Sequence, residues 1–425
     1  MDSPSKRKRR DELEAHFDPE KTPQPPIQNT TNSISDQPPP PFNIAGSPVD
    51  STDATTLFSR SLAARPHLPK PRTNSQRNQR SLSPSQQYRK RSDLQRLNHP
   101  IQFSLESDLR TALPQDAHAL YDALHDVQWG MDILPHALKD RPDTRIPDTH
   151  RGMWQSENPN ATEDTIKALV ERHVRFQGIV SRTKQSADLG RSEAAWNSHV
   201  HYQVLNILAE TSSIIAEDIT SARIVPRFRP CVVTVDDDDV SMSSASSYTS
   251  ATSASRGHKV KSVHKMVDFA LALEPESSLR TVIERYTKLS ADGTINQTSY
   301  FPLRNRPAPV FIETKTTSGN LETSGVQLGV WIAAWHESLR SIMRRSELGE
   351  RIITIPLIQV LEGTWTVMYA VDGGDELKII SGGQVPIGNS NSLMGMYQLQ
   401  AAFRAITEWM EGTFNVTVVF PKVIY

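Results

Sequence analysis

An apolar run that ends abruptly in charge, Pro309-Val-Phe-Ile-Glu-Thr-Lys315, constrains the fold of this 425-residue chain more than any other feature. A short run of bulky apolar residues is typical of a strand buried in the centre of a sheet. Side chains alternate along a strand, so Glu313 and Lys315 share one face at its end. A lone buried carboxylate is costly, so Glu313 needs a partner, which is either an ion-paired cation such as Lys315 or a metal ion.

A second apolar segment, 266–273, carries a single acid, Asp268. Alternation places Asp268 on the face of small or flexible side chains, where a cation can approach. The alternative is an acid on an edge strand that faces solvent. Two acids and a lysine at converging strand ends would form a site for a hard divalent cation beside a phosphate, which points to phosphodiester cleavage.

Strand and helix patterns interleave after about residue 103, which predicts one α/β domain with a mixed sheet at 106–425. A low-complexity insertion, predicted to be disordered, interrupts this domain at 236–257, and its run Asp236–Asp239 is more typical of solvated charge than of a metal site. We expect helices at 109–126, 161–180, 192–218, 279–289, 322–345 and 393–410, and strands at 230–235, 260–273, 309–315, 352–361, 364–371 and 416–420.

The first 105 residues are rich in Pro, Ser, Asn, Gln and Arg, and include the proline run 38–41. Such a segment cannot bury enough apolar surface to offset its ordering entropy, so we predict a disordered basic tail at 1–105. Its cluster Lys6, Arg7, Lys8, Arg9 and Arg10 resembles a nuclear-localisation signal, which predicts binding to the nuclear import machinery and a nuclear location. The alternative is a solvated charge run.

Charge is unevenly distributed although the net charge is −1. Residues 1–100 contain 16 Lys and Arg against 10 Asp and Glu, whereas the remainder contains 31 against 38. The acidic body would not attract nucleic acid over a long range, so binding would need a local basic groove. Candidates are Arg223, Arg227, Arg229, Arg304 and Arg306, although ordinary surface charge explains them equally well.

A single cysteine, Cys231, excludes a disulfide within the chain and cysteine-based zinc sites, and it fits a reducing, intracellular compartment. The N-terminus lacks the apolar stretch of a secretory signal, and no run of about 18 apolar residues predicts a membrane span.

Glu-x-Lys alone says little, because a second copy, Glu376-Leu-Lys378, is better explained by a turn that enters a strand. The copy at 313–315 is followed by a helix that carries Gln327, which can point back to the strand end, and by Trp331 and Trp335, whose spacing favours core packing.

Four segments together resemble a known family. They are Glu193-Ala-Ala-Trp-Asn-Ser-His-Val-His201, Lys265-Met-Val-Asp-Phe269, Ile312-Glu-Thr-Lys315 and Val326-Gln-Leu-Gly-Val-Trp331. Over residues 110–425 the chain looks like the fungal PD-(D/E)XK nuclease-like domain proteins of the PD-(D/E)XK nuclease superfamily. The resemblance implies a restriction-endonuclease-like α/β fold, with a mixed central sheet flanked by helices in the core order α-β-β-β-α-β. Val267 stands where the superfamily name has a proline, and the 45 residues from Asp268 to Glu313 include an extra helix.

The resemblance also implies roles and a cofactor. Asp268 and Glu313 would bind Mg²⁺ or Mn²⁺, and Lys315 would position the attacking water and stabilise charge on the phosphate. Glu193 would be a supporting acid and Gln327 an accessory polar residue, in a nuclease that acts on DNA. The alternative is a catalytically inactive nuclease-like fold that serves as a nuclear nucleic-acid- or protein-binding module. A third interpretation is an interaction protein in which the motif is accidental.

Overall fold

The computed structural model describes residues 88, 90–210, 212–234, 259–343, 352–383 and 385–415. The basic cluster at 6–10, the insertion at 236–257 and the strand expected at 416–420 lie outside these residues, so those predictions stay untested.

An eight-stranded mixed sheet forms the centre of the described domain, in the order β1-β9-β8-β7-β6-β5-β2, with β10 paired to β8. Its central pair, β6 and β7, is parallel, whereas β5 is antiparallel to both β6 and β2. A separate antiparallel hairpin consists of β3 and β4. The strands are β1 (Ile101–Leu105), β2 (Ile214–Asp218), β3 (Cys231–Thr234), β4 (Lys259–Ser262), β5 (Phe269–Leu273), β6 (Val310–Lys315), β7 (Ile355–Leu361), β8 (Thr364–Asp372), β9 (Leu377–Ser381) and β10 (Pro386–Asn389).

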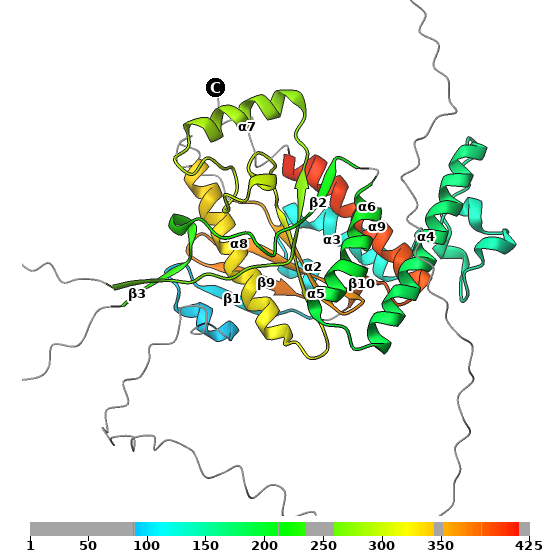
Figure 1. The fold of residues 1–425 in the computed structure, drawn as a ribbon, viewed down its shortest axis with the longest axis horizontal. Helices are drawn as coiled ribbons and strands as arrows, with labels where there is room; N and C mark the ends of the chain where they lie inside the picture. Colours follow the sequence, from blue (N-terminus) through cyan, green and yellow to red (C-terminus); the bar gives the residue numbers. More distant parts are fainter. Residues whose placement is uncertain are drawn as a thin grey trace, which may run out of the picture. The chain divides into compact units, whose positions relative to one another are not determined.

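Helices cover both faces of this sheet (Figure 1). On one face, the ring of Trp331 in α8 makes an edge-to-face contact with Phe311 of β6. On the other face, Phe403 of α9 makes the same kind of contact with Trp365 of β8. The α-helices are α2 (Leu109–Ala112), α3 (Gln115–Gln128), α4 (Glu163–Asp188), α5 (Glu193–Trp196), α6 (Tyr202–Ala209), α7 (Ser277–Leu289), α8 (Leu321–Met343) and α9 (Leu393–Trp409). Two π-helical turns, η5 (Asn197–His201) and η8 (Met410–Phe414), continue α5 and α9. The described 3₁₀ turns are η1 (Arg91–Arg96), η2 (His136–Leu138), η3 (Pro142–Thr144), η4 (Arg151–Met153), η6 (Pro226–Phe228) and η7 (Phe301–Leu303).

The chain order α5/α6, β2, β5, β6, α8, β7 reproduces the expected α-β-β-β-α-β core. The hairpin β3–β4 is inserted between β2 and β5, and α7 is inserted between β5 and β6. The prediction of a mixed α/β fold with flanking helices is therefore confirmed.

The helix expected at 192–218 is wrong in its second half. It ends at Ala209, and residues 214–218 form β2, which pairs along its whole length with β5. Ile214 and Ile215 fit a helical stripe, but pairing with a distant strand overrides that local pattern.

The tail boundary predicted at residue 105 is too late. Residues 101–105 form β1, which pairs in parallel with β9, and Leu94 in η1 is fully buried. Two further expected elements are divided: Pro114 separates α2 from α3, because proline lacks the N–H donor of a helix interior, and residues 263–268 separate β4 from β5.

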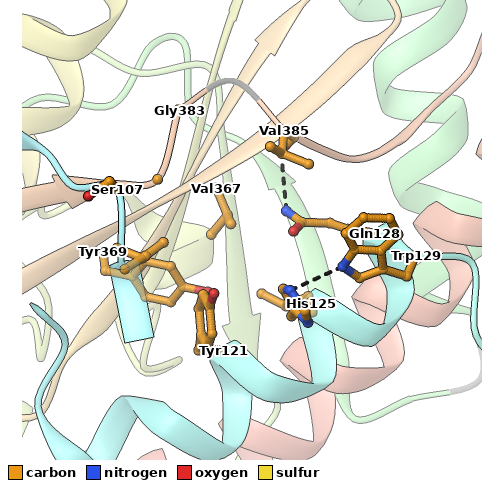
Figure 2. A pocket seen from close by; sticks show the side chains of 12 residues that line it. Ser107, Tyr121, His125, Gln128, Trp129, Val367, Tyr369, Gly383 and Val385 are labelled. Atoms are coloured by element: carbon orange, nitrogen blue, oxygen red, sulfur yellow. Dashed lines mark hydrogen bonds between the residues drawn. The ribbon is translucent and has the colours of Figure 1, made fainter. Parts of the chain in front are cut away.

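A cavity of about 290 Å³ lies between α3 and β8 (Figure 2). Tyr121 and His125 of α3 line it together with Trp129, the residue directly after this helix. Nε1 of Trp129 donates a hydrogen bond to Nε2 of His125 at 3.1 Å. Its lining contains no carboxylate, so this aromatic cavity is separate from the acids predicted to bind metal. Within the described residues, no helix is long and apolar enough to cross a membrane.

Candidate active site

Glu313 and Lys315 lie at the C-terminal end of β6, between β5 and β7. The Glu313 side chain is 1% exposed, and its Oε1 accepts a hydrogen bond from Nζ of Lys315 at 2.5 Å. Nζ also donates to the carbonyl of Thr314 at 2.8 Å. The central strand expected from sequence is therefore present, and its two charges form a buried ion pair.

Asp268 immediately precedes β5 and is 8% exposed, so it is not the solvent-facing acid of an edge strand. Its Oδ2 accepts hydrogen bonds from the backbone N–H of Thr314 and from the Thr314 hydroxyl, both at 2.9 Å. Oδ1 is then the oxygen that remains to bind a cation.

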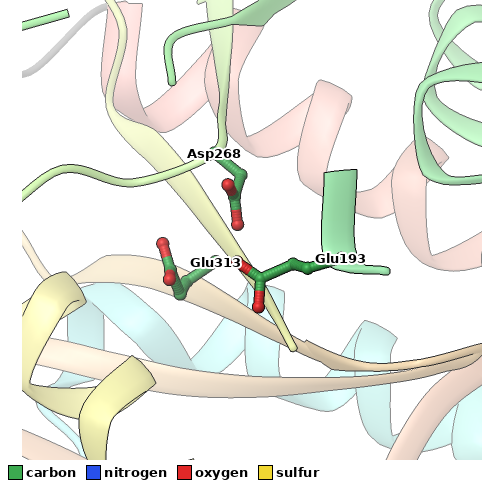
Figure 3. A group of neighbouring side chains, drawn as sticks. All are labelled: Glu193, Asp268 and Glu313. Carbon is green, nitrogen blue, oxygen red and sulfur yellow. The ribbon is translucent and has the colours of Figure 1, made fainter. Parts of the chain in front are cut away.

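Glu193 enters the same site from the first turn of α5, whose N-terminus is capped by the Ser192 hydroxyl. Its Oε1 accepts a hydrogen bond from Nζ of Lys315 at 3.1 Å. Glu193, Asp268 and Glu313 each place a carboxylate oxygen within 4.8 Å of the other two, and the three side chains face a common space (Figure 3). We call these three residues the acidic cluster.

Burial and charge act together on these groups. Burial and the neighbouring charge of Asp268 raise the pKa of Glu313 well above its ordinary value. Burial likewise raises the pKa of Asp268, although hydrogen bonds from Thr314 and the charge of Lys315 oppose it. Burial lowers the pKa of Lys315, but Glu313 and the other two acids outweigh it and raise the pKa overall, so its amine stays protonated.

Glu313 keeps one carboxylate oxygen for an additional ligand. Its Oε2 is buried and has no hydrogen-bond partner among the described residues. A buried oxygen without a partner costs free energy, and a divalent cation bound by oxygen ligands would remove that cost. The residues present thus fit a hard cation such as Mg²⁺ or Mn²⁺.

A buried polar network holds Asp268 from behind. The side-chain amide atom of Asn197 that faces this network lies 2.7 Å from Oγ1 of Thr314 and 2.8 Å from Nδ1 of His201. Nε2 of His201 donates to the carbonyl of Glu362 at 2.6 Å. The π-helical turn puts Asn197 and His201 at its two ends, and such turns are frequent at functional sites.

Proton counting fixes the direction of these hydrogen bonds. Burial lowers the pKa of His201 to about 4, so the ring is neutral and Nδ1 can only accept. The facing atom of Asn197 must then be its NH₂ group, which donates to His201 and to Thr314. The single hydroxyl proton of Thr314 remains for Asp268. The network therefore ends by donating to a cluster carboxylate.

Glu362 connects the network to the end of β6. It has a left-handed backbone (φ 50°), an uncommon conformation for a residue other than glycine. Its N–H donates to the carbonyl of Lys315 at 2.7 Å, and its carboxylate accepts the N–H of Thr317 at 3.2 Å. Sequence reasoning missed Asn197, His201, Thr314 and Glu362, although Asn197 and His201 interrupt an apolar helical stripe at i and i+4.

Independent evidence comes from a comparison with known families. The model of the PD-(D/E)XK nuclease superfamily matches residues 139–415. The chain belongs to the PD-(D/E)XK nuclease superfamily. No curated protein and no solved structure matches the chain.

In this PD-(D/E)XK protein, the hydrogen bond described for Gln327 does not go to a member of the acidic cluster. Its Nε2 donates to the carbonyl of Met266 at 2.8 Å, two residues before Asp268. Gln327 thus fixes the segment that carries an acid, and its predicted accessory role stays a prediction.

Most of the arginines predicted to bind nucleic acid are held by bonds within the protein. Arg227 pairs with Asp292 at 2.5 Å, and Arg306 pairs with Glu274 at 2.6 Å. Two others donate through Nε to carbonyls, Arg229 to Ile224 and Arg304 to Gly293, whereas Arg223 is exposed. Their role in binding stays a prediction.

His201 should make the stability of this PD-(D/E)XK protein depend on pH. Its pKa is about 4 when folded and about 6.5 when unfolded, so below pH 6.5 the unfolded chain binds more protons. Its contribution, about 3 kcal/mol above pH 6.5, is therefore lost as the pH falls from 6.5 to 4. We expect His201→Gln to reduce the slope of unfolding free energy against pH in this window.

The comparison between the wild type and His201→Gln by denaturant unfolding isolates this effect. Glu313 acts in the opposite direction, because its raised pKa favours the folded state at low pH, and both proteins share it. Equal slopes for the two proteins between pH 4 and 6.5 would contradict a neutral, buried His201.

Proposed function

We propose that the protein is a Mg²⁺- or Mn²⁺-dependent nuclease that hydrolyses phosphodiester bonds of DNA. The observation that carries this proposal is the buried, unpartnered Oε2 of Glu313 beside Asp268 and Glu193, among the described residues. The donor set consists of oxygen atoms, which Mg²⁺ and Mn²⁺ prefer to softer ligands. Membership of the nuclease superfamily supports the reaction class.

Asp268, Glu313 and Glu193 would hold the cation, which supplies Lewis-acid stabilisation of the phosphate and a more acidic bound water. The chain contributes orientation. Two donors from Thr314 fix Asp268, and the ion pair with Lys315 fixes Glu313, so both carboxylates are set before substrate binds. Preorganised charge of this kind needs little rearrangement during the reaction.

Lys315 acts in this proposal as a donor rather than a base, because its raised pKa keeps the amine protonated. Its three N–H groups already meet three acceptors, on Glu313, Glu193 and Thr314. The bond to Glu193 is the longest of the three, and the Glu193 side chain is 39% exposed. The hydrogen bond to Glu193 is therefore the one that would break, while the Glu193 carboxylate stays on the cation, so that Lys315 can stabilise negative charge on the phosphate.

The basic cluster at 6–10 supports the further proposal that this activity belongs to the nucleus. An import assay of the full chain fused to a fluorescent protein tests it directly. We expect nuclear accumulation that is lost when Lys6–Arg10 are replaced by alanine. Equal accumulation of both proteins would reject the cluster as the signal.

The decisive experiment for the activity is cleavage of circular and linear DNA, single- and double-stranded, with Mg²⁺ or Mn²⁺. We expect cleavage by the full chain and none by Glu313→Ala/Lys315→Ala. The second Glu-x-Lys offers a matched control, since Glu376 and Lys378 form a partly exposed ion pair. Glu376→Ala/Lys378→Ala should cleave like the wild type. Salt-sensitive DNA binding without cleavage by any of these proteins would favour the inactive binding module.

A further inference from the structure

A second cavity, of about 260 Å³, lies beside α8. Helix α8 forms one wall, and residues 98–99 and 227–231 form the others. No member of the acidic cluster lines it. Its polar lining includes Asn98, Arg227, Arg229, Cys231, His336 and Arg340.

His336 is the feature that points to a ligand. It is 1% exposed, and neither of its ring nitrogens has a hydrogen-bond partner among the described residues. Burial lowers its pKa to about 3, so the ring is neutral and offers one donor and one acceptor. Leaving both unused costs free energy. The aromatic cavity of Figure 2 has no such buried group in its lining.

The lining contains three arginines and one glutamate, Glu337, and two of these arginines are ion-paired within the protein, Arg227 with Asp292 at 2.5 Å and Arg340 with Asp372 at 2.6 Å. The hydrogen bond described for Arg229 runs from Nε to a backbone carbonyl. A guanidinium carries five N–H donors, so its other donors can bind a ligand. A guanidinium with further N–H donors suits phosphate oxygens, so Arg229 is the candidate phosphate ligand of this cavity.

One stretch of chain connects this cavity to the acidic cluster. Val263 donates its N–H to the carbonyl of Pro230, which lines the cavity, and Asp268 follows five residues later. His264 lies on this stretch, between Val263 and Asp268. Burial lowers its pKa most, and the nearby charges of Arg229, Arg223 and Lys265 lower it further. Positive charge therefore acts on the stretch of chain between the cavity and the cluster.

Helix α8 gives the distance between the cavity and the cluster along its axis. Gln327 contacts Met266 beside the cluster, and His336 lies nine residues further along the same helix. At 1.5 Å of rise and 100° of rotation per residue, the two side chains lie about 14 Å apart along the helix axis and on opposite sides of the helix. The axial separation alone corresponds to about four nucleotides of stacked strand at 3.4 Å each, and the path around the helix adds to this length.

We infer that this cavity receives the terminal nucleotide of the strand that the acidic cluster cuts, with the base against His336 and its phosphate against Arg229. The inference rests on the proposed function. A neutral imidazole matches the donors and acceptors of a base edge, whereas phosphate alone would use only its N–H. The volume is just below the roughly 300 Å³ at which pockets for drug-sized ligands begin, which suits a single nucleotide.

The one cysteine of the chain reports occupancy without any cleavage. Cys231 lines the cavity and is half-buried, so a bound ligand should slow its alkylation. The experiment is done in EDTA, with dAMP or a short single-stranded oligonucleotide at ten times its dissociation constant. About one site in eleven is then empty, so we expect each ligand to slow alkylation about tenfold. Ala333→Phe, which adds a ring to the cavity wall, should remove binding. Ala123→Phe on α3 is the matched control and should keep it.

Each probe tests a separate part of the inference. No protection of Cys231 by any nucleotide would overturn it, even for an active nuclease. Equal affinity for inorganic phosphate and dAMP would overturn recognition of the base. Protection by dAMP but not by the oligonucleotide would overturn recognition of a strand end and indicate a site for free nucleotide.

Product mapping completes the test with end-labelled single-stranded DNA and Mg²⁺. The wild type should release products of constant length, about four nucleotides or more. Ala333→Phe should lose that constancy. Constant length in both proteins would overturn the inference, whereas no cleavage by the wild type, with Cys231 still protected, would overturn the proposed function alone.

Discussion

Replacing Glu313 by glutamine is expected to slow metal-dependent cleavage about a thousandfold or more, which corresponds to about 4 kcal/mol of activation free energy. The amide keeps the shape of the side chain but loses the charge that a cation needs. Initial rates on plasmid DNA across a range of Mg²⁺ concentrations measure the effect. Saturating metal should not restore the rate, because the lost group stabilises the reaction itself.

Stability should not fall with activity in this variant. The buried carboxylate is desolvated, and Lys315 keeps its bonds to Glu193 and to the Thr314 carbonyl. We therefore expect the unfolding free energy of Glu313→Gln to equal or exceed that of the wild type. Glu376→Gln, in the second Glu-x-Lys, serves as the control and should change neither quantity. Wild-type cleavage by Glu313→Gln would reject Glu313 as a metal ligand.

Replacing Asn197 by aspartate is expected to weaken metal binding by about 10- to 100-fold, the usual range for groups that orient a ligand. The new carboxylate can only accept, so it draws the single hydroxyl proton of Thr314 away from Asp268. Asp268 then loses one of two donors to Oδ2. Calorimetric titration with Mn²⁺ and the metal dependence of cleavage both measure the shift.

Variants of Thr314 separate this positioning role from a purely structural one. Thr314→Ser keeps the hydroxyl and should bind metal like the wild type, whereas Thr314→Val should reproduce the loss seen with Asn197→Asp. A structural role alone would lower unfolding free energy in both Asn197→Asp and Thr314→Val while leaving the metal titration unchanged. That result would refute the proposed direction of the network.

Local sequence patterns were sufficient to predict the centre of the site. An apolar run followed by charge located β6, and its alternation located Glu313 and Lys315 on one face. The structure brings these residues together with Asp268 and Glu193, as the family resemblance implied. The start of the helix after β6 was also predicted within one residue.

Contacts between distant residues could not be predicted in this way. Thr314 meets Asn197 across 117 positions of sequence, and no periodic pattern records such a pair. Strand β2 was missed for the same reason, since its identity depends on β5 more than on its own residues. The cavity around His336 was invisible as well, because a histidine on an apolar helix face gives no sign of whether its nitrogens have partners.

Because of the π-helical turn between Glu193 and His201, the position of Glu193 depends on the number of residues in this helix more than on their identity. A π-turn holds one residue more than the α-helix would need over the same stretch. Deleting Ser198, an exposed residue that lines no cavity described here, would allow a regular helix to form. The same deletion would rotate Glu193 by about 100° relative to His201 and carry it away from Lys315. Homologues that keep the site should therefore vary in sequence along this helix but not in the number of residues it contains.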